Sequence, residues 1–150
     1  MKKVFVTMLV AAMGTAAFAT TGDPINTKAI LSFNQLFAAA TQVAWTPVEE
    51  TDLVKANFMY NGEQAEAYFN NEGEMVAAGR YIGLKQLPMA VIRQIDQKYA
   101  GYAVSPKVIE YETNGETAYV VTLVSDKQDL VVKATAGGVL SLQKKLRKKS

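Results

Sequence analysis

The 150-residue sequence contains neither histidine nor cysteine, and these two absences exclude several classes of function. Without histidine, a Ser-His-Asp or Cys-His catalytic arrangement cannot be built. Without either residue, a zinc site made of thiolate and imidazole is excluded as well. A glycine-rich phosphate loop is also missing, because no helical pattern follows Gly137-Gly138. The sequence therefore predicts no cofactor and no metal site, and leaves carboxylates, lysines and tyrosines for acid–base chemistry.

Two groups of neighbouring carboxylates are the remaining catalytic candidates. One group comprises Glu49, Glu50 and Asp52, and the other comprises Glu110 and Glu112. Paired carboxylates can hydrolyse a glycosidic bond, but they must face each other across a cleft. Glu110 and Glu112 alternate along a predicted strand, so both are expected on one solvated face. We therefore predict no catalytic residue and no enzymatic activity, and a carboxylate hydrolase is the least favoured hypothesis.

The first 19 residues have the order of a secretory signal peptide. Lys2-Lys3 precedes an apolar run from Val4 to Ala12, and small residues then lead to Ala17-Phe18-Ala19. The apolar run is too short for a membrane-spanning helix. We predict cleavage after Ala19, and no lipoprotein, because no cysteine is present to carry a lipid. The mature chain is expected to be periplasmic or secreted, without a transmembrane segment.

Charge is divided unevenly along the mature chain. Removing Lys2 and Lys3 from the 16 basic residues leaves 14, which equals the 14 acidic residues. Five of the basic residues lie at positions 144, 145, 147, 148 and 149, so the preceding body has 9 basic and 14 acidic residues, a net charge of −5. A basic tail can bind nucleic acid or anionic lipid, but an exported protein rarely meets nucleic acid. We predict a solvated, frayed basic tail over 147–150 and no nucleic-acid binding.

A single domain of two repeats is expected between an N-terminal leader and this tail. Residues 20–26 are polar and contain Gly22 and Pro24, which predicts a flexible leader. The neighbourhood of Asn61-Gly62 is echoed 53 positions later at Asn114-Gly115 (114 − 61 = 53). We interpret this echo as one α+β unit used twice, over 27–83 and 84–146 of a single domain over 27–146.

Hydrophobic spacing predicts the order helix, three strands, helix, four strands. Apolar stripes at helical spacing predict helices from Thr27 to before Trp45-Thr46-Pro47 and from Leu87 to before Gly101. Each Asn-Gly pair predicts a two-residue hairpin turn, since both positions of that turn require positive φ. The turns pair Phe58 with Ala65 and Tyr111 with Ala118. We predict an α+β fold made of a tandem α-β-β-β repeat with an antiparallel sheet.

The two hairpins differ on the face opposite the predicted core. In the first hairpin this face is polar, whereas in the second hairpin it is apolar. An exposed apolar sheet face usually marks an interface. The alternative is that the C-terminal segment or the partner repeat covers it, and the sequence leaves both open. The candidate partner-binding residues on these faces are Val108, Tyr119, Val121, Leu123, Lys55 and Tyr68.

An ordered set of short motifs runs through most of the mature chain. The set comprises Trp45, Val54-Lys-Ala-Asn-Phe58, Gly62, Ala65-Glu-Ala-Tyr-Phe69, Gly73, Leu87-Pro88-Met-Ala-Val91, Ile95 and Tyr99-Ala-Gly101-Tyr102. In this order, between about Phe33 and Leu142, it resembles the PepSY-like, beta-lactamase-inhibitor-like exported proteins of Bacteroidetes. The resemblance implies helices packed on one face of the sheet, no catalytic activity, and binding through the concave sheet face and its loops. It assigns no inhibitory loop to residues of this chain, and it does not make a beta-lactamase the partner.

Two binding functions therefore compete. The first is an exported, non-enzymatic module that contacts a protein partner, such as a peptidase or another envelope protein, through the open sheet face. Weak homodimerisation is a variant of this hypothesis. The second is a module that handles a small apolar ligand or lipid, with the apolar face lining a groove. A flat or mildly concave face would favour the first hypothesis, and an enclosed apolar cavity would favour the second.

Overall fold

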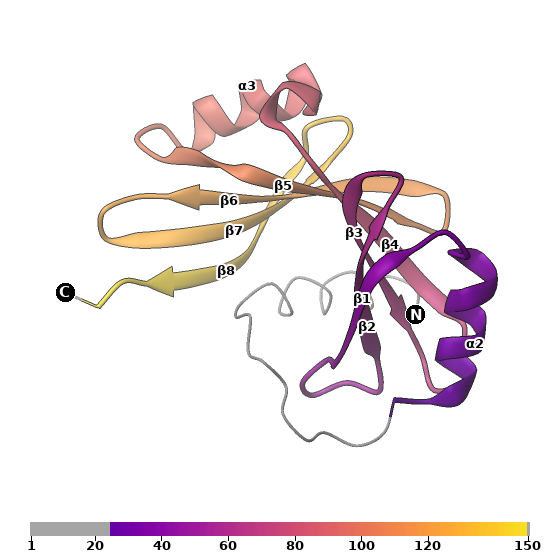
Figure 1. Ribbon diagram of the computed structural model, residues 1–150. Helices are drawn as coiled ribbons and strands as arrows, with labels where there is room; N and C mark the ends of the chain where they lie inside the picture. Colours follow the sequence, from indigo (N-terminus) through magenta and orange to yellow (C-terminus); the bar gives the residue numbers. More distant parts are fainter. Residues whose placement is uncertain (1–24, 150) are drawn as a thin grey trace.

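The computed structural model describes residues 25–149, which form an eight-stranded antiparallel sheet and two α-helices (Figure 1). The predicted signal peptide over 1–19 and most of the predicted leader over 20–26 lie outside the described residues. Within 25–149, no helix combines the length and the apolar character needed to cross a membrane. The elements are α2 (Thr27–Leu36), β1 (Thr41–Pro47), β2 (Val54–Tyr60), β3 (Glu63–Phe69), β4 (Met75–Ile82), the 3₁₀ turn η2 (Leu84–Gln86), α3 (Met89–Lys98), β5 (Ala103–Thr113), β6 (Glu116–Val124), β7 (Gln128–Thr135) and β8 (Leu140–Arg147).

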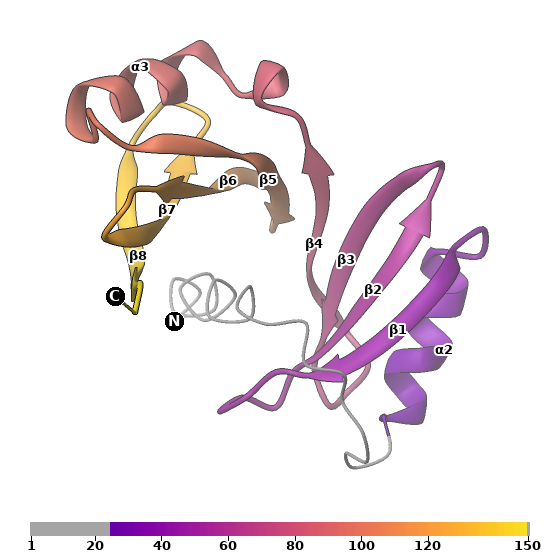
Figure 2. The ribbon, with the colours of Figure 1, turned by 60° about the vertical axis from the view of Figure 1, so that its left-hand side comes forward.

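The sheet follows the chain, because each strand is hydrogen-bonded to the strand that precedes it in sequence. The first four strands follow α2 and the last four follow α3. In Figure 2 the two halves of the sheet are inclined to each other, and each helix lies on the outer side of its own half. The α+β class and the antiparallel sheet are therefore as predicted.

The predicted first helix is wrong beyond Leu36. Asn26 caps the helix start, since its side chain accepts a hydrogen bond from the Lys28 amide at 2.9 Å. The helix ends at Leu36, and Thr41–Pro47, whose residues up to Ala44 were expected to be helical, forms the additional strand β1. The reversal brings Trp45 of β1 back onto Phe33 of α2, with ring centroids 5.4 Å apart in an edge-on arrangement. Each half of the sheet thus has four strands, whereas the sequence predicted three strands in the first half and four in the second.

Both Asn-Gly hairpins are confirmed. Asn61 and Asn114 have positive φ values of 51° and 53°, and Gly62 and Gly115, which follow them, have φ values of 81° and 77°. These conformations match a two-residue turn whose twist suits antiparallel strands. The pairings of Phe58 with Ala65 and of Tyr111 with Ala118 are also as predicted.

The two Asn-Gly turns do not occupy equivalent places, however. Asn61-Gly62 joins the second and third strands after α2, whereas Asn114-Gly115 joins the first and second strands after α3. The helices, the first strands and the second strands of the two halves start 62 positions apart (89 − 27, 103 − 41 and 116 − 54). The 53-residue echo between the two Asn-Gly turns therefore does not mark the structural correspondence of the two halves.

Both helices pack on the same face of the sheet. Under α2, Phe33 contacts a cluster that includes Ala67 of β3. Under α3, Val91 contacts a cluster that includes Val108 of β5. The strand pairing shows that the two clusters lie on one face. Ala67 pairs with Ala78, and Ala78 pairs with Glu112, so these three residues share a face. Val108 lies four positions from Glu112 on the same strand and therefore points to the same side. No α-helix formed by residues 25–149 lies on the opposite side of the sheet, which we call the helix-free face.

The basic C-terminus continues the sheet edge. Arg147 is the last residue of β8. The next residue, Lys148, donates its backbone N–H to the Lys127 carbonyl at 3.1 Å and its Nζ to the Ser125 carbonyl at 2.7 Å. The prediction of a frayed tail from 147 onward is therefore wrong as far as Lys148.

Candidate functional site on the helix-free face

The predicted apolar contact surface is core. Val108, Tyr119, Val121 and Leu123 lie side by side, as the hairpin register predicted. They nevertheless pack against α3, where Val91 is part of the same cluster, and Tyr119 is the most exposed of the four at 7%. The expectation that they lie on the face away from the helices is wrong, and none of them is available to a partner in this conformation.

Apolar residues on both faces of the second hairpin explain this error. The alternate residues Ile109, Tyr111, Val120 and Val131 are also buried, in a cluster on the helix-free face. Alternation identifies the face to be buried only when the opposite face is polar. Because both faces of these strands are apolar, the pattern could not show which one α3 covers.

The other two candidates, Lys55 and Tyr68, do lie on the helix-free face, where they are direct partners in neighbouring strands. Tyr68 is fully buried, whereas Lys55 is half-buried. Asn57 and Met59, which alternate with Lys55 along β2, are half-buried as well, and Gln64 of β3 is exposed. The face is therefore closed at its centre and accessible over β2 and the start of β3.

A buried carboxylate lies at the closed centre of this face. Glu66 of β3 is 1% exposed. Tyr68 donates its hydroxyl to Glu66 Oε1 at 2.8 Å, Tyr111 of β5 donates to the same oxygen, and Tyr81 of β4 donates to Oε2 at 3.4 Å. Three donors from three strands thus compensate for removing the carboxylate from water. We call Glu66 and the three tyrosines the Glu66 cluster.

Sequence patterning does not single out Glu66, because it is one of several polar residues on the outward face of the first hairpin. A signal was present, because Tyr68 lies two positions further along the same strand and therefore on the same face. The other two donors, Tyr81 and Tyr111, belong to different strands, and their approach follows from the pairing of β4 with β5.

The tyrosines of this cluster act as hydrogen-bond donors and not as bases. Burial, reinforced by the nearby Glu66 charge, raises the pKa of Tyr81 to about 12. The same two causes raise the pKa values of Tyr68 and Tyr111 well above the ordinary 10.0. All three hydroxyls remain protonated at neutral pH. The arrangement therefore holds the sheet centre in place and offers no proton acceptor among its phenols.

A groove of about 640 Å³, open to solvent, lies at one end of the sheet, between the β1–β2 loop and the β3–β4 turn. It is lined by Glu50, Thr51, Asp52, Leu53, Asn70, Asn71, Glu72 and Val76. Three of these residues are carboxylates, so the groove differs from the enclosed apolar cavity that the ligand-handling hypothesis requires. In the part of the chain that the structure describes, no group of three or more acidic residues is arranged to hold a metal ion.

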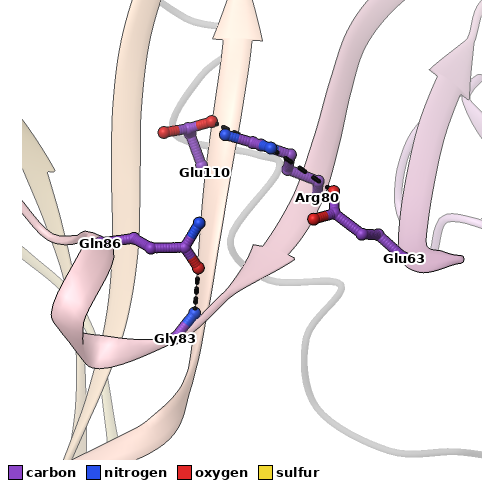
Figure 3. A network of polar contacts seen from close by, with 5 residues as sticks. All are labelled: Glu63, Arg80, Gly83, Gln86 and Glu110. Atoms are coloured by element: carbon purple, nitrogen blue, oxygen red, sulfur yellow. Dashed lines mark hydrogen bonds and ion pairs between the residues drawn. The ribbon is translucent and has the colours of Figure 1, made fainter. Parts of the chain in front are cut away.

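On the helix-covered face, Arg80 links the two halves of the sheet (Figure 3). Its Nε lies 2.8 Å from Glu110 Oε1 in β5, and its Nη1 lies 3.4 Å from Glu63 Oε2 in β3. The hydrogen bond and charge of Glu110 raise the pKa of the Arg80 guanidinium. Glu110, expected to be solvated, is thus partly buried in an ion pair, which gives it a structural role.

Figure 3 also shows the hydrogen bond that closes the 3₁₀ turn η2 after β4, in which Gln86 Oε1 accepts the Gly83 amide at 2.9 Å.

The chain was compared with protein families, curated proteins and solved structures. No family model and no curated protein matches the sequence. A BLIP-like protein from Bacteroides fragilis superposes with a TM-score of 0.66 at 20% identity, over 85% of this chain and 90% of that one. A DUF2874 family protein from Bacteroides ovatus superposes with a TM-score of 0.67 at 23% identity, over 84% and 89%.

A third structure, a proposed periplasmic protein from Bacteroides eggerthii, superposes with a TM-score of 0.67 at 14% identity, over 86% of this chain and 90% of that one. The similarity thus spans nearly the full length of each protein, and the TM-scores establish a common fold. The chain therefore has the fold of BLIP-like and DUF2874 proteins of Bacteroides, in agreement with the resemblance seen in its motifs.

Proposed function

We propose that the protein is an exported, non-enzymatic binding module that contacts a protein partner through the helix-free face and its adjoining loops. The observation that carries the proposal is that both helices cover one face of the sheet, while Lys55, Asn57 and Met59 remain half-buried on the other. A sheet face with accessible side chains and no covering helix is a surface on which another protein can pack. The BLIP-like and periplasmic neighbours support a binding role in the envelope.

The Glu66 cluster supports this proposal by fixing the shape of the face. Its hydrogen bonds join β3, β4 and β5 where the two halves of the sheet meet, which restrains the movement of one half against the other. A surface that is already rigid loses little conformational entropy on binding. Protein–protein contacts bury about 800 Å² on each partner, an area better matched by a broad sheet face than by the groove between the loops.

Site-specific photo-crosslinking tests the proposed surface. A photoreactive residue at Asn57 would report on the helix-free face, and the same residue at Gln94, which is exposed on α3, is the matched control. With envelope extract of the native host, we expect one crosslinked protein from position 57 and not from position 94. Equal crosslinking from both positions, or crosslinking from position 94 alone, would contradict the proposed surface.

Paired substitutions measure the contribution of the face to affinity once that partner is purified. Lys55→Glu with Met59→Asp changes the helix-free face, and Lys85→Glu with Met89→Asp makes the same chemical changes on η2 and α3. We expect only the first pair to weaken binding, and by roughly tenfold or more, because it places new charges in the contact. Thermal unfolding of both variants checks that the fold is retained.

The competing ligand-handling function and the homodimer variant have separate tests. Organic extraction of the purified protein followed by mass spectrometry should yield no stoichiometric lipid, because the groove is open to solvent and three of its lining residues are carboxylates. Sedimentation velocity over a concentration series should show a monomer, with at most weak self-association that Met59→Asp removes. A stoichiometric lipid would instead favour the ligand-handling function.

A further inference from the structure

Among residues 25–149, the outer edge of β8 is an ordered strand edge with no neighbouring strand. β8 is the last strand in the sheet order, and its partner in this part of the chain is β7. The bonds from Lys148 to Lys127 and Ser125 continue this attachment beyond Arg147, so the edge is held along its length. The unpaired row of backbone N–H and C=O groups on such a strand is a template for another strand.

Cationic side chains are concentrated along this edge. Lys144, Lys145, Arg147 and Lys149 are all exposed. A fifth cation of this C-terminal segment, Lys148, forms an ion pair within residues 25–149, and its Nζ lies 3.2 Å from Asp129 Oδ1. The other four cations have no carboxylate partner there, although the body of the mature chain is acidic.

The positions of these cations favour an extended partner over a flat anionic surface. Lys144 pairs with Val131, on the helix-free face, and Lys145 pairs with Leu130, on the helix-covered face. Successive cations therefore point to opposite sides of the sheet, and a flat membrane could engage only one row. A strand lying beside β8 would present its own side chains to both rows.

A second copy of the chain is a poor occupant of this edge. Pairing β8 with β8 would bring two identical cationic segments together, and like charges directly opposite each other are destabilising. Lysines on edge strands commonly prevent association of that kind. The same charges would favour a segment of opposite sign, since repulsion of wrong partners and attraction of the correct one together produce specificity.

We propose that the edge of β8 binds an acidic, extended segment of a protein partner, which adds to the sheet as a further strand. Backbone hydrogen bonds to β8 provide the attachment, as in other cases of strand addition. The register shift opposite Val131 and Val132 of β7 divides β8 into two regularly paired stretches, 140–142 and 144–147. The cations lie on the second stretch, so the acidic residues align there. Leu146, on the same side as Lys144 and 36% exposed, provides an apolar contact between the charges.

Synthetic peptides test this proposal on the mature wild-type protein. The probe matches the 8 residues of β8 and alternates Glu with Val, and one control replaces Glu by Lys. A second control keeps every Glu but carries N-methyl groups on alternate residues, which removes backbone donors without changing charge. We expect fluorescence anisotropy to show binding of the first peptide alone, weakened by added salt, and hydrogen exchange to show new protection of β8 amides.

A pair of protein variants controls for net charge. Lys144→Glu with Lys145→Glu changes the edge, and Lys85→Glu with Arg93→Glu makes the same change in net charge on η2 and α3. We expect roughly tenfold weaker peptide binding for the first variant and little change for the second, because only the first places like charges beside the peptide. Equal binding of the N-methylated peptide would overturn strand addition, and binding to anionic phosphatidylglycerol vesicles without binding to the peptide would assign the edge to lipid instead.

Discussion

The hydroxyl of Tyr111, in β5, donates a hydrogen bond to the carboxylate of Glu66, in β3, across 45 positions of sequence. The two residues belong to different halves of the sheet, and β4 lies between their strands. Both side chains are buried, so the bond is made away from water. The contact joins the halves where they are inclined to each other, and the shape of the proposed binding face depends on it.

Replacing Tyr111 by Phe should destabilise the protein. The substitution keeps the ring but removes one donor to a buried carboxylate, and hydrogen bonds to charged groups contribute about 2 kcal/mol. Urea denaturation would measure the loss in the free energy of unfolding. Tyr60→Phe is the control, because the Tyr60 hydroxyl has no hydrogen-bond partner among the described residues, and we expect a change within about 0.5 kcal/mol. An equal loss of stability in both variants would show that the hydrogen bond to Glu66 contributes no more than any other tyrosine hydroxyl.

The same cluster predicts how stability responds to alkaline pH. Burial raises the pKa of Tyr81 to about 12 from an ordinary 10.0, and raises those of Tyr68 and Tyr111 further. A pKa raised by folding means that the contribution to stability is complete below pH 10 and is lost as pH rises through about 12. We expect the urea midpoint to fall across this range, and Tyr81→Phe to reduce the slope of the fall.

Tyrosinate absorbance provides a direct check of that prediction. The chain has 7 tyrosines, and the buried hydroxyls of the Glu66 cluster should ionise after the exposed ones or only as the protein unfolds. Circular dichroism recorded on the same samples reports the folded fraction. Ionisation of all tyrosines near pH 10 in a protein that is still folded would contradict the assigned environment.

Local rules predicted the hairpins well, because an Asn-Gly turn fixes register within the few residues around it. They failed for β1, because the apolar stripe that begins at Ile30 continues through Phe37 to Ala40 at helical spacing. The helix ends at Leu36, and Gln42 then adopts a φ of 53°, which is unusual outside glycine. The strand forms because Trp45 packs on Phe33 and because β1 pairs with β2, and neither contact is visible in local spacing.

The candidate site was harder to predict than the fold, because it depends on which face of β5 and β6 the helix covers. Tyr119 and Tyr111 lie on opposite faces of these strands, and both are buried. Choosing the wrong face made a core surface look like an interface. Glu66 was missed for a related reason, since the charge of a side chain does not reveal that three hydroxyls from three strands will meet it.

Leu123→Ala should distinguish core from interface for the surface under α3. Leu123 is fully buried in the α3 cluster, and truncating a buried leucine leaves a cavity that costs about 3 kcal/mol. Leu31→Ala on α2, where the leucine is 58% exposed, is the matched control and should change stability little. Chemical denaturation measures both variants. A stable Leu123→Ala protein with altered self-association would restore the interface interpretation.

Export is predicted from residues outside the described part of the chain. Expression of the full sequence with mass spectrometry of the envelope fraction should give a protein that begins at Thr20, after cleavage at Ala17-Phe18-Ala19. A variant with Ala17 and Ala19 replaced by Gln should retain the longer form, because the cleavage site requires small side chains. Recovery of an intact wild-type chain from the envelope would contradict the prediction.

The last prediction concerns Gly79, which lies directly beneath the Tyr111 ring. The two residues are partners in β4 and β5, and a Cβ added at Gly79 would lie 2.7 Å from Tyr111 Cδ1 and Cε1. Gly79→Ala should therefore displace the ring, weaken its bond to Glu66 and cost about 2 kcal/mol, within the usual range for overpacking. Gly83→Ala is the control, since the nearest atom to its new Cβ is Gln86 Oε1 at 3.7 Å, an ordinary contact. Urea denaturation compares the variants, and the tyrosine absorbance titration reports Tyr111. A Gly79→Ala protein as stable as Gly83→Ala, with its late-ionising tyrosines unchanged, would show that the ring does not depend on this close approach.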